Sequence, residues 1–194
     1  YQYAEKITNL KQISSYKNII KLELHRAFHL KDISALELCS NISVLSIKQA
    51  LCLQNINVLK KCNKLVTLIL HTPKLKDYTC LETIHSLKNV SFHGCKHFNN
   101  VKVLYKNTGL EKLHFFNCTQ IVLPTTPYPF TRLCGYTHTR LQITSLIPIK
   151  NVLQKSLSTI NRLDVSNNAE LTSIDGSIHF PNIKSLRSSK TGIT

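Results

Sequence analysis

The chain has 194 residues, with 25 lysines and arginines against 10 acidic residues and a formal net charge of +15. A hydrophobic content of 42% is enough for a folded core and argues against long-range disorder. No run approaches the roughly 18 apolar residues that a membrane helix needs, so a membrane-spanning protein is excluded.

An apolar pattern repeats along the chain, and it is clearest at 160–174, where Ile160, Leu163, Val165, Asn168, Leu171 and Ile174 follow the pattern LxxLxLxxNxxLxxI with aliphatic substitutions. Taken in chain order, the upstream units begin with Ala4, Ile7 and Leu10, and continue with Ile19, Leu22, Leu24, Ala27; Ile42, Leu45, Ile47, Ala50; Leu65, Leu68, Leu70, Pro73; Leu87, Val90, Phe92, Cys95; Leu110, Leu113, Phe115, Cys118; and a degenerate Phe130, Leu133, Gly135, His138. A last unit follows with Ile183, Leu186, Ser188 and Thr191.

The ninth position of these units falls at 27, 50, 73, 95, 118, 138, 168 and 191, with steps of 23, 23, 22, 23, 20, 30 and 23 residues. Random apolar spacing does not hold such a register, so the chain resembles the leucine-rich-repeat family over nearly its whole length. The resemblance implies an α/β solenoid, a horseshoe or arc with a parallel concave β-sheet and short 3₁₀, helical or extended segments on the convex side. Its short, cysteine-bearing repeats resemble the irregular subclasses of the family.

The spacing has a physical reason. Alternating strand residues point to opposite faces, so the two leucines of LxL enter the core and their neighbours face out. The side chain at the ninth position points inward, where an Asn satisfies backbone groups and a thiol does so weakly. The side chains of Ala27, Ala50 and Pro73 cannot form such hydrogen bonds. We expect water or other backbone groups to bond the free backbone groups in their units instead.

The return segments 32–39 and 55–62 carry apolar residues three apart, which predicts short 3₁₀ turns or one to two turns of helix on the convex side. Cys39 and Cys62 occupy equivalent positions, and we expect them to lie one above the other. A reduced pair packed in the convex core is favoured over a disulfide.

The stretch 119–159 breaks the rhythm, because it contains Pro124, Pro127, Pro129 and Pro148 between two abnormal steps. It fits either a shortened unit followed by an insertion or a junction between two arrays. Residues 149–157 look weakly helical. Neither alternative requires a second domain, so we expect one array of about eight to nine units over 1–194. The chain has no Met and starts at Tyr1, which indicates a piece of a longer chain.

Cations outnumber acids at the outward strand positions of the predicted concave face. The cations are Lys21, Arg26, Lys48, Lys88, Lys112, Arg132, Arg162, Lys184, Arg187 and Lys190, against Glu23, Glu111 and Asp164. The clearest row is Lys112, Arg132 and Arg162, one from each of three successive units. Such a face favours binding of an acidic partner.

Rings occupy the middle of the same face. His71, His93, Phe116 and Tyr136 fill the seventh position of four consecutive units, and His114 lies beside Phe116. Strands about 4.8 Å apart would place these rings in one continuous ridge. The ridge resembles an interface core with a charged rim, although the rings would also serve simply to stack on and shield the sheet.

Two kinds of chemistry are not expected. His93 and Cys95 point to opposite sides in the repeat pattern, so they cannot share a metal ion, and no cofactor is predicted. There is no GxSxG motif, no phosphate-binding glycine loop and no recognisable carboxylate pair, so we expect no enzyme and no small-molecule substrate.

The sequence therefore predicts a non-catalytic protein–protein interaction scaffold that binds an acidic partner on a basic concave face lined by aromatic and histidine side chains. Two alternatives stay open: a structural component associated with RNA or ribonucleoprotein, and an extracellular recognition or adhesion array. No secretory signal opens the chain, so an intracellular location in cytoplasm or nucleus is expected, and the extracellular one stays open because the N-terminus looks trimmed.

Overall fold

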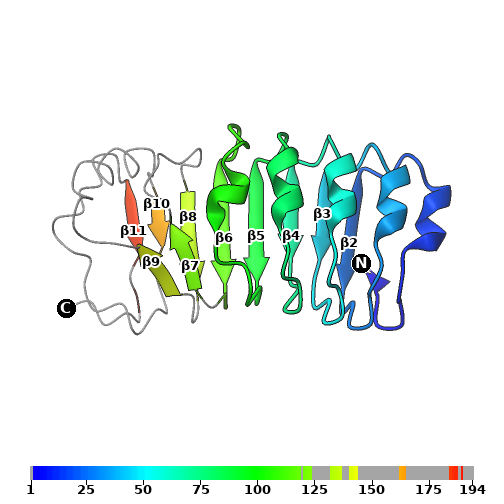
Figure 1. The fold of residues 1–194 in the computed structure, drawn as a ribbon, viewed down its shortest axis with the longest axis horizontal. Coiled ribbons are helices and arrows are strands. Elements are labelled where there is room, and N and C mark those ends of the chain that lie inside the picture. Colours follow the sequence, from blue (N-terminus) through cyan, green and yellow to red (C-terminus); the bar gives the residue numbers. More distant parts are fainter. Residues whose placement is uncertain are drawn as a thin grey trace.

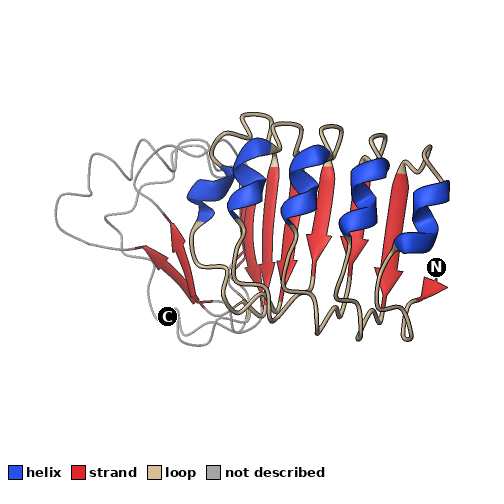
Figure 2. Ribbon diagram, turned by 45° about the vertical axis from the view of Figure 1, so that its right-hand side comes forward, coloured by secondary structure: helices blue, strands red, loops and turns tan. Residues whose placement is uncertain are grey.

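Over residues 2–104 each repeat unit folds as a strand, a turn and a 3₁₀ helix, as the apolar spacing predicts. The computed structural model describes residues 2–118, 120–123, 132–136, 140–143, 162–164, 184–187 and 189. Figure 1 shows the strands side by side behind a row of short helices. Turned by 45°, the helices all lie on one side of the sheet and leave its other side open (Figure 2).

The elements alternate regularly through the first half of the chain. The strands are β1 (Gln2–Tyr3), β2 (Lys21–His25), β3 (Val44–Ile47), β4 (Thr67–Leu70), β5 (Asn89–His93), β6 (Lys112–Phe116), β7 (Gln120–Leu123), β8 (Arg132–Tyr136), β9 (Arg140–Ile143), β10 (Arg162–Asp164) and β11 (Ser185–Arg187). The 3₁₀ helices are η1 (Lys11–Ser15), η2 (Ser34–Leu38), η3 (Asn57–Lys61), η4 (Thr79–Thr83) and η5 (Val101–Leu104). None of these described helices is long and apolar enough to cross a bilayer.

Nine of the described strands form one parallel sheet in the order β1-β2-β3-β4-β5-β6-β8-β10-β11, and β7 pairs with β9 in a second, two-stranded sheet. The first apolar residue of the LxL pattern in each strand pairs with its counterpart in the next strand, as predicted. The series is Leu22, Leu45, Leu68, Val90, Leu113, Leu133, Leu163 and Leu186. The leucine-rich-repeat fold is therefore confirmed. Most of 119–159 lies outside the described residues, as do 149–157 and the ninth-position residues His138, Asn168 and Thr191.

The core lies between the sheet and the row of 3₁₀ helices. Inward strand residues such as Leu68 and Leu70 are fully buried. Leu36 from η2 and Leu59 from η3 are also buried, with at most 1% of their surface exposed. A group of aromatic rings fills the core between units: Phe92 stacks on Phe98 with ring centroids 4.1 Å apart. Each unit thus buries its apolar residues against its neighbours, as the energetics of a solenoid require.

The 3₁₀ helices begin at a recurring polar residue that the sequence analysis missed. In each unit a side-chain oxygen accepts a hydrogen bond from the backbone N–H two residues later, at 2.8–3.1 Å. These residues are Asn9, Asp32, Asn55, Asp77 and Asn100. Such Asx turns supply partners for backbone donors that the helix leaves unpaired, and they lower the pKa of the two carboxyl groups, Asp32 and Asp77.

One ninth position was assigned wrongly. Thr72 points inward, fully buried, while Pro73 is partly exposed. The units of β2, β3, β5 and β6 place one residue with positive φ between strand and ninth position, namely Arg26, Gln49, Gly94 and Asn117. The turn after β4 is one residue shorter and lacks this left-handed residue, so the inward side chain comes one position earlier. The Thr72 hydroxyl lies 3.5 Å from the Cys95 sulfur and supplies the polar group that Pro73 could not.

The six cysteines whose side chains the structure describes are free, and five of them are buried. Cys39 and Cys62 lie in the convex core as a reduced pair, as predicted. Burial, with a smaller contribution from Cys39, raises the pKa of the Cys62 thiol to about 11. Because the thiolate is the reactive form, these side chains act as small hydrophobic groups.

Candidate functional site

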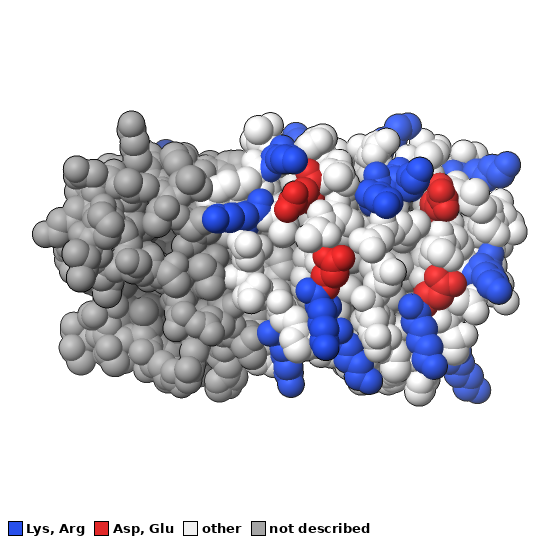
Figure 3. Space-filling view, in the orientation of Figure 1, with Lys and Arg blue, Asp and Glu red and all other residues white. Residues whose placement is uncertain are grey.

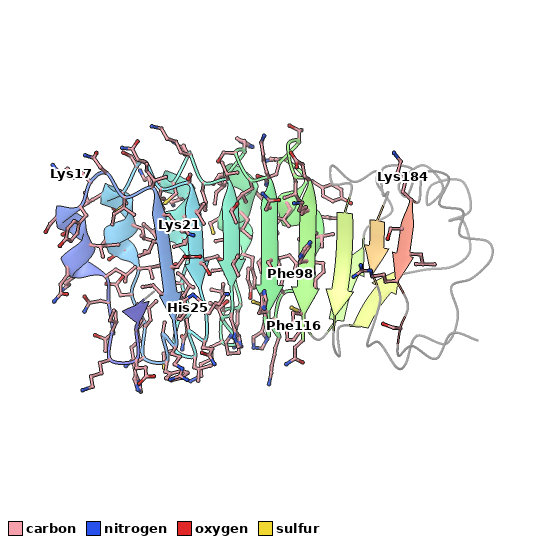
Figure 4. The ribbon with its side chains drawn as sticks, turned by 180° about the vertical axis from the view of Figure 1, so that it is seen from behind. Lys17, Lys21, His25, Phe98, Phe116 and Lys184 are labelled. Carbon is pink, nitrogen blue, oxygen red and sulfur yellow. The ribbon has the colours of Figure 1, made fainter. Side chains whose placement is uncertain are left out.

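The open side of the sheet carries three rows of residues that run across the strands. They are defined by strand register and named upper, middle and lower as they lie in Figure 4. The upper row contains Lys21, Val44, Thr67, Asn89, Lys112, Arg132, Arg162 and Ser185. The middle row contains Glu23, Ser46, Ile69, Ser91, His114, Cys134, Asp164 and Arg187. The lower row contains His25, Lys48, His71, His93, Phe116 and Tyr136, since the ladder of backbone hydrogen bonds continues through Lys48 and His71. This open sheet face corresponds to the predicted concave face.

Figure 4 shows the open sheet face, with Lys21 toward one end of β2 and His25 and Phe116 toward the opposite ends of β2 and β6. The upper and lower rows are therefore separated by the length of a strand. Lys112 and Phe116 are four positions apart along β6, which spans about 13 Å at 3.3 Å per residue. A partner that contacts both must cover most of the width of the sheet.

The predicted row of cations is in register. Lys112 pairs with Arg132, and Arg132 with Arg162. Lys112 is half-buried at the start of β6. The side chains of Arg132 and Arg162 lie outside the described residues, so their part in a site stays a prediction that rests on backbone placement.

Two rings of the predicted ridge are in contact. The centroids of His93 and Phe116 lie 5.5 Å apart with the ring planes tilted by 32°. Phe116 is 43% exposed, so the outer face of its ring is open to a partner. The Ser91 hydroxyl lies 2.9 Å from Nε2 of His93 and holds that ring in place. Tyr136 pairs with Phe116 in register, but its side chain is outside the described residues.

His71 has a different environment. An added Cβ at Gly94 would lie 2.9 Å from Nε2 of His71, so the imidazole ring packs directly on the glycine backbone. The missing side chain at Gly94 leaves room for this ring. His71 is half-buried, and burial lowers its pKa.

His93 is neutral at pH 7. Burial is the main cause that lowers its pKa to about 4, and the positive charges of His71, Lys48 and His114 contribute further. The lower row between β4 and β6 is therefore an uncharged strip of imidazole and phenyl rings at neutral pH, with Lys48 at one side.

The depressed pKa of His93 makes stability depend on pH. Between its ordinary pKa of 6.5 and the folded value of about 4, the unfolded chain binds a proton that the folded chain does not. The free energy of unfolding therefore falls as the pH drops from 6.5 through 4. We expect His93→Gln to reduce this loss by about 1 kcal/mol, since water screens a half-exposed ring. Urea unfolding at pH 7 and pH 4.5 measures the difference, with the exposed His97→Gln as control. An identical pH dependence in wild type and His93→Gln would contradict this account.

Sequence reasoning missed part of the site. His25 belongs to the same row as the four predicted rings, and the repeat pattern would have found it; Lys48 was predicted as a cation of this face but was not assigned to this row. It also overestimated the free positive charge: Lys21 pairs with Glu23 at 3.0 Å, and Arg26 pairs with Glu5 at 3.0 Å. Figure 3 shows lysines along the edges of the helix side as well, so positive charge is not confined to the open sheet face.

The predicted separation of His93 and Cys95 is confirmed. Cys95 is fully buried, with its sulfur 3.5 Å from the carbonyl oxygen of Leu70, while His93 lies on the open sheet face. Within the described part of the chain, no three or more His, Cys, Asp or Glu side chains are placed to hold a metal ion.

The fold is similar to that of solved leucine-rich-repeat proteins. An internalin (inlF) from Listeria monocytogenes matches 97% of this chain and 53% of its own, with a TM-score of 0.66 and 19% sequence identity. The functional domain of InlJ from the same organism, which includes a cysteine ladder, matches 93% of this chain and 42% of its own, with a TM-score of 0.54 and 16% identity. An internalin C2 (inlC2) from this bacterium matches 74% and 72%, with a TM-score of 0.52 and 13% identity.

The chain thus spans about half the length of the first of these structures. No protein-family model matches the sequence, and no curated protein sequence matches it significantly. The likeness establishes the leucine-rich-repeat fold.

Proposed function

We propose that this leucine-rich-repeat solenoid is a non-catalytic scaffold that binds an acidic protein segment on its open sheet face. The observation that carries the proposal is the contact between His93 and Phe116, two rings 5.5 Å apart on the side of the sheet opposite the 3₁₀ helices, with Phe116 43% exposed. Large aromatic groups at such positions commonly form the buried centre of an interface.

The charges around this ring pair favour an acidic partner. Lys112 begins the strand that ends at Phe116, and Lys48 lies in the same row as His93. Arg132 and Arg162 follow Lys112 in the strand register, one on each of the next two strands of the sheet. Cations at the rim of an apolar contact steer an acidic segment toward it and fix its orientation, and their effect weakens with salt.

A protein partner is favoured over RNA because the exposed rings are few among the side chains of this face that the structure describes, and the strip beside them is uncharged at pH 7. Binding of single-stranded RNA relies on a continuous positive groove with several stacking rings, whereas the middle of this face carries Ser46, Ile69 and Ser91. The basic composition alone is weak support for nucleic acid.

A selection experiment tests the proposal with a peptide library in place of the natural partner. A displayed library of 12-residue peptides is selected on the immobilised chain, and binders are measured by fluorescence anisotropy at two salt concentrations. We expect selected peptides that combine Asp or Glu with aromatic residues and that bind more weakly at high salt. Binders without carboxylates, or preferential binding of an oligouridine RNA in the same assay, would overturn the proposal.

The charge-reversed variant Lys112→Glu, Arg132→Glu and Arg162→Glu tests the assigned face. We expect at least a tenfold loss of affinity for the selected acidic peptides, because attraction at three rim positions becomes repulsion. The matched control reverses Lys60, Lys61 and Lys102, three exposed lysines on η3 and η5, and changes the net charge by the same amount. Equal losses in both variants would mean that net charge rather than the open sheet face governs binding. Circular dichroism checks that both variants stay folded.

A further inference from the structure

From β3 to β6, a stretch that the structure describes throughout, no carboxylate occupies any position of the three rows, and Glu111 lies just before β6. Its twelve positions there are Val44, Ser46, Lys48, Thr67, Ile69, His71, Asn89, Ser91, His93, Lys112, His114 and Phe116. They include three histidines and two lysines. Glu23 is in the middle row of the neighbouring strand β2, where it pairs with Lys21.

The histidines of the lower row are set among groups that oppose their protonation. His93 receives like charge from His71 just after β4, from Lys48 just after β3 and from His114 in β6. Phe116 covers one side of its ring, and Ser91 on the same strand contacts Nε2. His71 packs on the backbone of Gly94. None of these neighbours supplies a negative charge, so both imidazoles are neutral in the free protein at pH 7.

We propose that a carboxylate-bearing segment of the protein partner lies across the lower row from Lys48 to Phe116, and that His71 and His93 take up protons as it binds. This inference rests on the proposed function and adds the partner's chemistry and a dependence on pH. The bound carboxylate supplies the counter-charge that the face lacks, while the Phe116 ring packs against an apolar part of the same segment.

The direction of the pH dependence follows from linkage. An opposite charge within about 4–6 Å stabilises the imidazolium form and raises the pKa of each histidine in the complex above its value in the free protein. Because the complex then binds more protons than its separate components, affinity increases as the pH falls. If bound His93 regains an ordinary pKa near 6.5, affinity rises by about tenfold between pH 7.5 and pH 5.5, and proton uptake by His71 adds to this rise.

The test uses the selected acidic peptides as probes, at constant ionic strength and at pH 7.5, 6.5 and 5.5, where peptide carboxylates stay ionised. We expect affinity for the wild-type chain to rise by at least about tenfold over this range. The double variant His71→Gln and His93→Gln should lose most of the increase. The double variant His29→Gln and His97→Gln, which removes two exposed histidines outside the three rows, should keep it. A peptide with Gln in place of each Glu should show no rise.

The outcomes separate this inference from the proposed function. Acidic peptides that require Lys112, Arg132 and Arg162 but bind equally at pH 7.5 and 5.5 overturn proton uptake and leave the proposed function standing. A rise that persists in the His71 and His93 variant also overturns it. If the charge-reversed variant binds the peptides normally, or if no carboxylate-bearing peptide is selected, both proposals are wrong.

Discussion

Leu68→Asp should unfold the array at 25 °C. Leu68 is fully buried in β4, in the middle of the described repeats, and pairs with Leu45 on one side and Val90 on the other. The substitution removes a core side chain, which costs about 2–5 kcal/mol, and places a carboxylate where no cation or hydrogen-bond donor compensates it. The sum exceeds about 5 kcal/mol, comparable with the whole stability of a typical domain. Far-UV circular dichroism and urea titration measure the loss.

Thr67→Asp is the matched control, since Thr67 precedes Leu68 but lies on the open sheet face and is partly exposed. A carboxylate there reaches water, so we expect a change of less than about 1 kcal/mol. Similar unfolding curves for Leu68→Asp and wild type would show that the inward and outward positions are assigned wrongly.

Phe92→Ala should cost about 3–5 kcal/mol, the second largest effect expected for a single substitution. Phe92 is fully buried and lies at the centre of the aromatic core, with ring centroids 4.1 Å from Phe98, 6.0 Å from Phe115 and 5.7 Å from Tyr78. Its removal leaves a cavity between two units and ends these ring contacts. The midpoint of urea unfolding gives the size of the loss.

Phe116→Ala is the comparison for this variant, because it removes the same side chain from the open sheet face, where Phe116 is 43% exposed. We expect it to cost less than about 1.5 kcal/mol of stability while it weakens peptide binding. Equal destabilisation by the two substitutions would contradict the division between a buried aromatic core and an exposed binding ring.

The sequence predicted the sheet well because the apolar period alone sets which residues point inward. Leu45, Leu68 and Leu113 fall on one line of register, and the 3₁₀ helices at 34–38 and 57–61 fall within the predicted return segments. In a solenoid each unit contacts chiefly its neighbours, so a local pattern repeated at constant spacing carries most of the tertiary information.

The turn after β4 shows where this reasoning fails. Thr72 and Pro73 are adjacent, and a period of 22 or 23 residues accommodates either as the ninth position. The decision depends on a left-handed residue in the turn, which is present as Arg26, Gln49, Gly94 and Asn117 and absent after β4. Only one of these four is a glycine, so composition does not reveal the conformation.

For the candidate site, the sequence placed His71, His93 and Phe116 in one row but did not predict their protonation. The depressed pKa of His93 arises from burial by neighbouring side chains and from charges in three other repeat units. The combined effect of burial and charge on this pKa depends on how side chains of neighbouring strands pack, which the spacing of residues within one strand does not reveal. The pairing of Lys21 and Arg26 with carboxylates likewise depends on side-chain geometry.

Mapping a bound acidic peptide by NMR tests the binding face most directly. A ¹⁵N-labelled chain is titrated with a selected peptide, and shifts of backbone amides and of histidine rings are followed. We expect the largest changes at His71, His93, Lys112, His114 and Phe116, with little change on η2, η3 and η4. Shifts concentrated on those 3₁₀ helices, with β4, β5 and β6 undisturbed, would show that the partner binds the opposite side of the solenoid.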